Sequence, residues 1–439
     1  MLKGIKFNLR SLLKRPFKIG IITPQYPEKG STTNKGVAVH TFYLTHELAK
    51  LGAEVHIFTG ANKHSIKTEY IGEGKRVVHR MNTKIELPVQ DFMIEKKFSI
   101  VIFDNKVIEE VIRENSKEKF DVIHSHITMT GALMSKYFKN LKWIHTFHVL
   151  EKNRLKFMSD EEKKYFGVER WKESTLSYAD ALITVSRKLR EEMLKDYPIK
   201  EKKVFYIPNG VDIETFKPLN VPEEKKVTYV GRFSPEKGID LTVKIAEKVL
   251  SKDDKVKFVI VAPPYKIMPP AMEKVREKLT ELEKQFSGRL IWHKEPLSRE
   301  ELAVLYNESM VYVQPSRYES FGMTVLEAMA CGKAVITSNR GGLPEVVGKG
   351  GLCLTLNTNL FAKAILTLLE DYRFRERLAR RGLDKSKEYL WQEIGKQTYD
   401  LYKILAKKNQ EESNEKVKEG LQKLDELSEE GEKNENSVQ

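Results

Sequence analysis

Glu319 and Glu327 stand eight residues apart, on either side of a point where a loop is predicted to open a helix. The loop covers Glu319–Gly322 and the predicted helix covers Met323–Ala330. The free N–H groups and the positive dipole end of a helix start suit a diphosphate, and Gly322 permits close backbone approach. One carboxylate can clamp the two hydroxyls of a ribose while the other holds sugar hydroxyls. Two glutamates alone would equally fit a solvated surface, and the loop between them favours a ligand site.

A second group of chemically capable residues lies in the segment Gly231–Gly238, which reads GRFSPEKG. Arg232 follows a predicted strand, and Lys237 stands at the start of a predicted helix. Both cations could reach one diphosphate, Arg232 through its planar fork and Lys237 as a point charge. In a basic protein, the alternative is a pair of solvated cations.

Histidines form the third group, and nine of the ten precede residue 150. His148 ends a strand-like run, whereas His124 and His126 share one face of another predicted strand because strand side chains alternate. No acidic or cysteine partner has ligand spacing to this pair, so the sequence predicts no metal site.

The elements that position these residues alternate between strand and helix. Strands are predicted at Phe17–Thr23, Ala53–Thr59, Phe120–His126, Lys142–Phe147, Ala181–Ser186 and Val204–Ile207, with helices such as Val37–Leu51, Val107–Asn115 and Arg187–Asp196 between them. After Pro208 the alternation restarts, with strands at Val227–Val230, Lys257–Ala262, Met310–Val313, Ala334–Thr337 and Leu352–Leu356. Ser298 and Glu301 form a capping box before a further helix. This pattern predicts an α/β protein with two parallel sheets, each covered on both faces, and a ligand crevice between the halves.

Composition limits the cellular setting. The net charge is +14, although the tail from Lys408 carries ten acidic and five basic residues, so the body is basic and suits anionic partners. A lysine- and glutamate-rich surface typical of thermophiles is the alternative explanation. The chain has two cysteines and no apolar run long enough for a membrane span, which predicts a cytoplasmic protein. Residues 1–16 form a basic arm that could lie as an amphipathic helix on anionic lipid or pack against the first domain.

Taken together, the motifs resemble the signature of the family 4 retaining glycosyltransferases, which have the GT-B fold and belong with the glycogen synthases and sucrose-phosphate synthases. The resemblance runs from about Phe17 to about Ala406. Besides the glutamate block, its motifs are Gly36-Val37, Asp121–His126, His145–His148, Val185-Ser186, Pro208–Asp212, Gly231–Gly238 and Gly341–Val347.

The resemblance implies two Rossmann-like domains facing a cleft, with a C-terminal helix that crosses back to the first domain. The implied boundaries are 1–16 for the arm, 17–208 for the acceptor domain, 209–390 for the nucleotide-sugar domain, 391–407 for the crossover helix and 408–439 for a charged, disordered tail. By resemblance, Glu319 holds the donor sugar, Glu327 grips the ribose, and His148 faces the transferred sugar. The remaining implied donor-binding residues are Gly36, Val37, Arg232, Lys237, Ser320, Phe321, Gly322, Met323 and Thr324. The family retains anomeric configuration and needs no bound metal or other cofactor.

Two departures from the family pattern affect these expectations. Lys35 precedes Gly36 where many members have a second glycine, and Ala262-Pro263-Pro264 replaces a glycine-rich turn on the nucleobase side. Lys152 and Arg154 follow His148 and could meet an acceptor phosphate.

The expected partners are a nucleotide-diphosphate sugar, an acceptor that is a sugar, sugar phosphate or lipid-linked group, and no nucleic acid. A GT-B sugar-nucleotide epimerase and a basic nucleic-acid or membrane scaffold are the competing functions.

Overall fold

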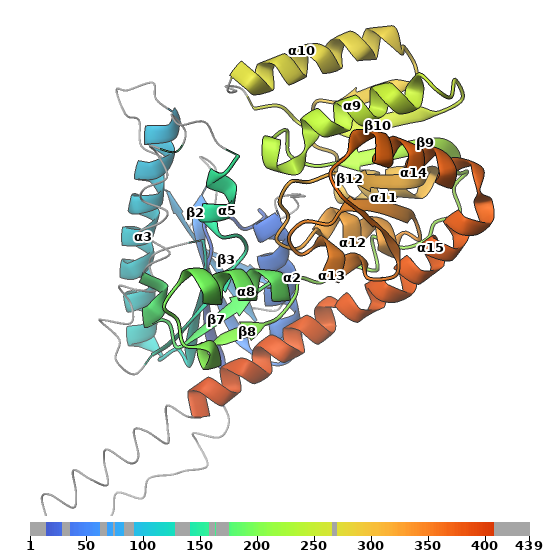
Figure 1. Ribbon diagram of the computed structural model, residues 1–439. Helices are drawn as coiled ribbons and strands as arrows, with labels where there is room; N and C mark the ends of the chain where they lie inside the picture. The colour runs from blue at the N-terminus through green and yellow to red at the C-terminus, as the bar shows by residue number, and fades with distance from the viewer. Residues whose placement is uncertain are drawn as a thin grey trace, which may run out of the picture.

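The computed structural model describes residues 15–28, 36–61, 68–72, 75–82, 92–127, 141–157, 163, 175–265 and 270–407. Two α/β bodies lie side by side, and a long C-terminal helix runs back from the second to the first (Figure 1). The basic arm up to residue 14, Lys35 and the tail from 408 lie outside the described residues, so the predictions made for them stay predictions.

The first body is built on an eight-stranded sheet. Its strands are β1 (Lys18–Ile22), β2 (Glu54–Ala61), β3 (Thr68–Ile71), β4 (Arg76–Asn82), β5 (Val122–His126), β6 (Lys142–Phe147), β7 (Ala181–Thr184) and β8 (Val204–Tyr206), in the order β3-β4-β2-β1-β5-β6-β7-β8. Its helices are α2 (Gly36–Lys50), α3 (Phe92–Lys117), α5 (Glu151–Leu155) and α8 (Arg187–Asp196), with short 3-10 turns at Thr175–Tyr178 and Glu201–Lys203. The sequence predicts a parallel sheet, and that is wrong at one edge because β3 pairs antiparallel with β4.

The second body has a six-stranded sheet in which every pairing is parallel. Its strands are β9 (Glu224–Val230), β10 (Lys257–Val261), β11 (Leu290–His293), β12 (Ser309–Gln314), β13 (Ala334–Ser338) and β14 (Gly351–Leu354), in the order β11-β10-β9-β12-β13-β14. Its helices are α9 (Ile239–Leu250), α10 (Pro270–Gln285), α11 (Arg299–Glu308), α12 (Met323–Ala330), α13 (Leu343–Val347), α14 (Thr358–Glu370) and α15 (Tyr372–Ser386), with 3-10 turns η3 (Pro235–Lys237) and η4 (Lys387–Tyr389). The predicted capping box is confirmed, since Ser298 and Glu301 exchange side-chain-to-backbone hydrogen bonds.

In both sheets the order in which successive strands are added reverses at the first strand. In the first sheet β1 lies between β2 and β5, and in the second β9 lies between β10 and β12. Open parallel sheets bind ligands beyond the carboxyl ends of their strands at such a switch point. The loops that follow β1, β5, β9 and β12 are therefore the places to look for a site.

A helix over residues 391–407 packs against the first sheet, as the sequence predicts (Figure 1). Trp391, Ile394 and Leu401 are buried in the apolar cluster that contains Ile19 and Leu44 of the first body. The Tyr402 hydroxyl oxygen lies 2.5 Å from His124 Nδ1. The crossover helix thus shares the core of the domain to which it returns.

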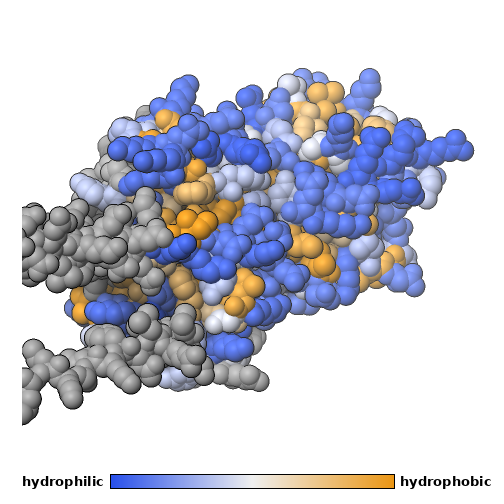
Figure 2. Space-filling model, turned by 90° about the horizontal axis from the view of Figure 1, so that it is seen from below, coloured by the Kyte–Doolittle hydropathy of each residue, from blue (hydrophilic) through white to orange (hydrophobic). Residues whose placement is uncertain are grey.

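The two bodies also share an apolar core. One cluster of buried side chains runs from Trp143 and Phe147 in the first body to Tyr306 and Phe321 in the second. The face in Figure 2 is mostly hydrophilic, with apolar side chains in separate patches. Among the described residues, no helix is both long and apolar enough to cross a membrane.

Candidate donor site

The switch point of the second sheet is flanked by two loops that touch through their backbones. Gly231–Gly238 follows β9, and Pro315–Gly322 follows β12. Gly238 has a φ of +70°, and a Cβ there would lie 2.1 Å from the carbonyl oxygen of Pro315. Arg317 N–H donates to the carbonyl oxygen of Glu236 at 2.9 Å. Only glycine at 238 allows the two loops to pack this closely.

Charged side chains from the two loops meet at this junction. Lys237 Nζ lies 2.5 Å from Glu319 Oε2, and both side chains are largely buried. Arg232 pairs with Glu236 at 2.9 Å, yet 48% of its side chain stays accessible. The structure therefore brings together Arg232, Lys237 and Glu319, with Arg232 at the solvent side.

Helix α12 begins directly after Gly322, as the sequence predicts. Gly322 caps the helix with φ +107°, a backbone conformation that residues other than glycine rarely adopt. Gly341, with φ +58°, packs so closely that a Cβ would lie 1.9 Å from the carbonyl oxygen of Glu319. Gly342 N–H donates to that same oxygen at 2.8 Å. Glycines in two loops thus fix the backbone of the Glu319–Gly322 segment.

Three further residues predicted to bind the donor, Ser320, Phe321 and Thr324, lie in the protein interior or against other side chains. The Phe321 ring is buried and packs edge-on against Tyr389 with centroids 5.6 Å apart, so a ligand could meet only its backbone. Thr324 Oγ1 lies 2.9 Å from the Tyr312 hydroxyl, and Ser320 is buried.

The start of α2 in the first body approaches the start of α12 in the second. Gly36 and Met323 are the first residues of their helices, and a Cβ on Gly36 would lie 3.7 Å from Met323 Sδ. Val37 is half-buried next to it. Each helix start carries free N–H groups and a partial positive charge. With Lys237 and Arg232 nearby, this junction is suited to an anion held by both domains.

Glu327 is buried one turn inside α12 and is paired with a residue that sequence reasoning missed. Arg299 Nη1 donates to Glu327 Oε1 at 3.2 Å. Burial raises the pKa of the Glu327 carboxyl, and Arg299 opposes that rise. The Arg299 guanidinium also lies 4.6 Å from the Phe216 ring centroid and 5.3 Å from that of Tyr43, on α2. The sequence offers one sign that Arg299 has a specific partner: it is a basic residue in the first turn of a capped helix, where acidic residues are favoured.

His124 and His126 share one face of β5, as the sequence predicts, and their ring centroids lie 4.3 Å apart. His124 is a core residue whose nitrogens lie 2.5 Å from the Tyr402 hydroxyl and 2.7 Å from Thr146 Oγ1. His126 Nδ1 instead lies 3.0 Å from His148 Nε2, and the His40 ring lies 4.7 Å from that of His148. The sequence analysis considered only acidic and cysteine partners for this pair, whereas α2 and the end of β6 bring two further imidazoles, His40 and His148, to His126. Burial lowers the pKa of His148 well below its usual value, so the ring is neutral.

Lys152, one of the two residues predicted to meet an acceptor phosphate, is already paired in this structure. Lys152 Nζ lies 2.6 Å from Asp196 Oδ1, so the lysine already has a carboxylate partner. The side chain of Arg154 lies outside the described residues. A phosphate at this place would have to compete with Asp196 for the lysine.

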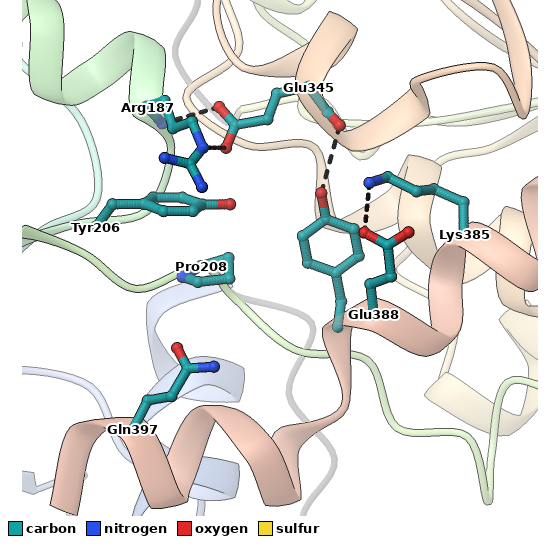
Figure 3. Close-up of a pocket in the computed structure, with 8 residues that line it drawn as sticks. Arg187, Tyr206, Pro208, Glu345, Lys385, Glu388 and Gln397 are labelled. Carbon is teal, nitrogen blue, oxygen red and sulfur yellow. Dashed lines mark hydrogen bonds and ion pairs between the residues drawn. The ribbon is translucent and has the colours of Figure 1, made fainter. Parts of the chain in front are cut away.

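A separate cavity of about 420 Å³ lies at the hinge, which is the boundary where the two domains meet. Residues of α8, β8, α13, η4 and the 391–407 helix line it (Figure 3). Arg187 N–H donates to Glu345 Oε2 at 2.8 Å across the domain boundary. The Arg187 guanidinium also stacks 4.5 Å from the Tyr206 ring centroid. Among the described residues, none of the predicted donor-binding side chains lines this cavity. We assign it to the contact between the domains.

The glycine packing yields a testable prediction. Replacing Gly341 by alanine should displace the Glu319 carbonyl and lower kcat/KM by roughly a hundredfold, since small misplacements in a site have effects of this size. Gly348→Ala is the matched control, because its φ is +51° but its nearest neighbour is the flexible end of Lys385 at 3.6 Å. Gly348→Ala should destabilise the fold by about 1–3 kcal/mol of backbone strain. Gly341→Ala should destabilise it more, because its Cβ also meets the Glu319 carbonyl. Thermal melts and steady-state kinetics measure both effects, and equal activity in the two variants would contradict the prediction.

The chain is similar in sequence to known glycosyltransferases. A model described as Glycosyltransferase Family 4 matches residues 34–215, and one described as Glycosyl transferases group 1 matches residues 211–385. The D-inositol 3-phosphate glycosyltransferase of Corynebacterium urealyticum is 26% identical over 419 residues, covering 88% of this chain and 95% of that protein. The alpha-maltose-1-phosphate synthase of Mycolicibacterium smegmatis is 27% identical over 417 residues, covering 89% and 100%.

Similarity to solved structures supports the fold. The sucrose-phosphate synthase of Thermosynechococcus elongatus superposes with a TM-score of 0.72 at 23% sequence identity, covering 89% of this chain and 99% of that one. Two parallel-sheet domains and a returning C-terminal helix form the same arrangement in this chain. The chain therefore belongs to the group 1, family 4 glycosyltransferases, a retaining family with the GT-B fold that transfers sugars from nucleotide donors.

Proposed function

We propose that this glycosyltransferase transfers a sugar from a nucleoside diphosphate sugar to an acceptor hydroxyl with retention, and that no metal ion takes part. The observation that supports this most is the convergence of the α2 and α12 starts beside Lys237 and Arg232. A diphosphate placed there would contact backbone N–H groups of both domains. Fixed donors and cations stabilise the charge that develops on a leaving diphosphate, which is the role a metal plays elsewhere.

The resting contact between Lys237 and Glu319 gives this proposal a specific order of events. Each group is the other's partner at 2.5 Å before a donor arrives. An incoming diphosphate carries more negative charge than one carboxylate, so Lys237 turns towards it. Glu319 is then left to accept hydrogen bonds from hydroxyls of the donor sugar. Donor binding thereby prepares the carboxylate that holds the transferred group.

The remaining roles follow from placement. Glu327 grips the ribose, and Arg299 donates to that buried carboxylate and opposes the rise of its pKa that burial causes. His148, a neutral imidazole at the end of β6, faces the transferred sugar from the first domain. The acceptor hydroxyl attacks from the face that the diphosphate leaves and gives its proton to a departing phosphate oxygen. Relatives named for inositol phosphate and maltose phosphate favour a sugar, sugar phosphate or other polyol acceptor.

Metal independence is tested with a chelator. Because fixed cations and N–H groups surround the proposed diphosphate position, transfer should continue in excess EDTA at its original rate or faster. The measurement is product formation with and without EDTA, followed by addition of Mg²⁺ or Mn²⁺. Complete loss of activity that manganese restores would refute this part of the proposal.

The two glutamates should fail in different ways. Glu327→Ala should weaken binding of the free nucleoside diphosphate, because the ribose it grips does not react. Glu319→Ala should leave that affinity nearly intact and lower kcat, because its contact strengthens as the sugar develops charge. A lost hydrogen bond to a charged group is worth ~1.5–3 kcal/mol, so each effect should be about ten- to a hundredfold.

Calorimetry with the nucleoside diphosphate, beside steady-state kinetics for both variants, measures the difference. Equal loss of nucleoside diphosphate binding in Glu319→Ala and Glu327→Ala would show that the pair is one structural unit, and the separate roles would be withdrawn.

A further inference from the structure

Three histidines from three elements meet at the carboxyl edge of the first sheet. His40 lies on α2, His126 is the last residue of β5, and His148 directly follows β6. Because β5 and β6 are parallel neighbours, their carboxyl ends lie at one edge. One ring nitrogen from each histidine lies within 4.8 Å of the others.

The hydrogen bonding leaves lone pairs in this cluster. Asn209 Oδ1 lies 2.8 Å from His40 Nδ1, and an amide oxygen can only accept, so Nδ1 carries the proton. His40 Nε2 then bears a lone pair, is buried, and has no hydrogen-bond partner within the described part of the chain. His126 Nε2 is likewise buried and unpartnered among the described residues. His126 Nδ1 and His148 Nε2 lie 3.0 Å apart and hydrogen-bond to each other, so binding by both rings requires that this bond be exchanged for the ion. A buried polar atom without a partner is unfavourable, and a bound ligand would remove that cost.

The hydrogen bonding favours a metal rather than an anion as that ligand. Because Asn209 holds the His40 proton on Nδ1, Nε2 presents a lone pair to the cluster, and a lone pair binds a cation and repels an anion. Neutral imidazole is the form that binds metals, and a hydrogen-bond acceptor on the second ring nitrogen is the usual support for such a ligand. Asn209 supplies that support for His40.

We propose that His40, His126 and His148 form a binding site for a nitrogen-preferring divalent ion, Zn²⁺ above all, and that the bound ion blocks donor binding. An all-imidazole set suits Zn²⁺, Cu²⁺ or Ni²⁺, whereas Mg²⁺ and Mn²⁺ prefer oxygen ligands. The blocking effect rests on the proposed function, in which His148 faces the donor sugar. The ion is therefore an inhibitor of a reaction that needs no metal.

A second cluster in the same domain serves as an internal comparison. His56, His79 and Glu114 also lie within ligand distance of one another. There, however, His56 Nε2 is 2.7 Å from Glu54, His56 Nδ1 is 3.0 Å from His79 Nε2, and His79 Nδ1 is 3.1 Å from Glu110. All four ring nitrogens already have partners, so this cluster should not take the first ion.

The test titrates chelator-treated, desalted full-length protein with Co²⁺ and, separately, with Zn²⁺. The visible absorption of tetrahedrally bound Co²⁺ and Zn²⁺ calorimetry should both give one tight site per chain. His40→Gln and His126→Gln should each lower the affinity at least tenfold, Asn209→Ala by about 10–100-fold, and His79→Gln not at all. Circular dichroism and thermal melts establish that each variant is folded, and two separate ligand variants guard against loss of one.

Absence of a stoichiometric site, or loss of binding in His79→Gln but not in His40→Gln, would overturn the site. These readouts do not depend on activity, so they stand whether or not the proposed transfer is observed. For the blocking effect, Zn²⁺ should inhibit competitively with the donor and EDTA should reverse it. Tight Zn²⁺ binding without inhibition would overturn that second part.

Discussion

The donor site depends on backbone packing that only glycine permits. Gly238 lies against the Pro315 carbonyl, and Gly341 lies against the Glu319 carbonyl, at separations where any Cβ would clash. The first contact holds the loops after β9 and β12 together, and the second holds the loop after β13 against Glu319. Lys237 is thereby placed beside Glu319. Gly322, with φ +107°, then caps the start of α12. Side-chain chemistry at the site thus follows from two tight turns in the main chain.

The first domain is tied to this frame through contacts near the hinge. Tyr43 on α2 donates to Asp212 at 2.7 Å, and Arg299 lies between Asp212, Tyr43 and Glu327. The buried glutamate proposed for the ribose is therefore connected to the helix whose start approaches Met323. The crossover helix adds a second tie through Trp391, which packs edge-on to His40. A change in domain position would alter both halves of the site together.

Local sequence signals predicted the elements well because their physical causes are local. The alternation of short apolar runs, the Ser298–Glu301 capping box and the glycine before α12 each act within a few residues. The charged, irregular strands β3 and β4 lacked such a pattern and were missed. Arg299 and Glu327 are 28 residues apart, and His40 reaches His126 only through folding, so no local spacing reveals either group. The roles of the site residues depended on family resemblance, and the structure adds their partners.

The central claim is that a diphosphate binds between the two helix starts beside Lys237 and Arg232. Calorimetry with a panel of nucleoside diphosphates and the matching nucleosides tests it most directly, using Lys237→Gln, Arg232→Gln and the hinge variant Lys385→Gln. Losing one charge-assisted contact should weaken nucleoside diphosphate binding about ten- to a hundredfold in the first two variants, leaving nucleoside binding and Lys385→Gln unchanged. If Lys237→Gln and Arg232→Gln bind the nucleoside diphosphate as tightly as the parent protein, the diphosphate does not lie there and the account is wrong.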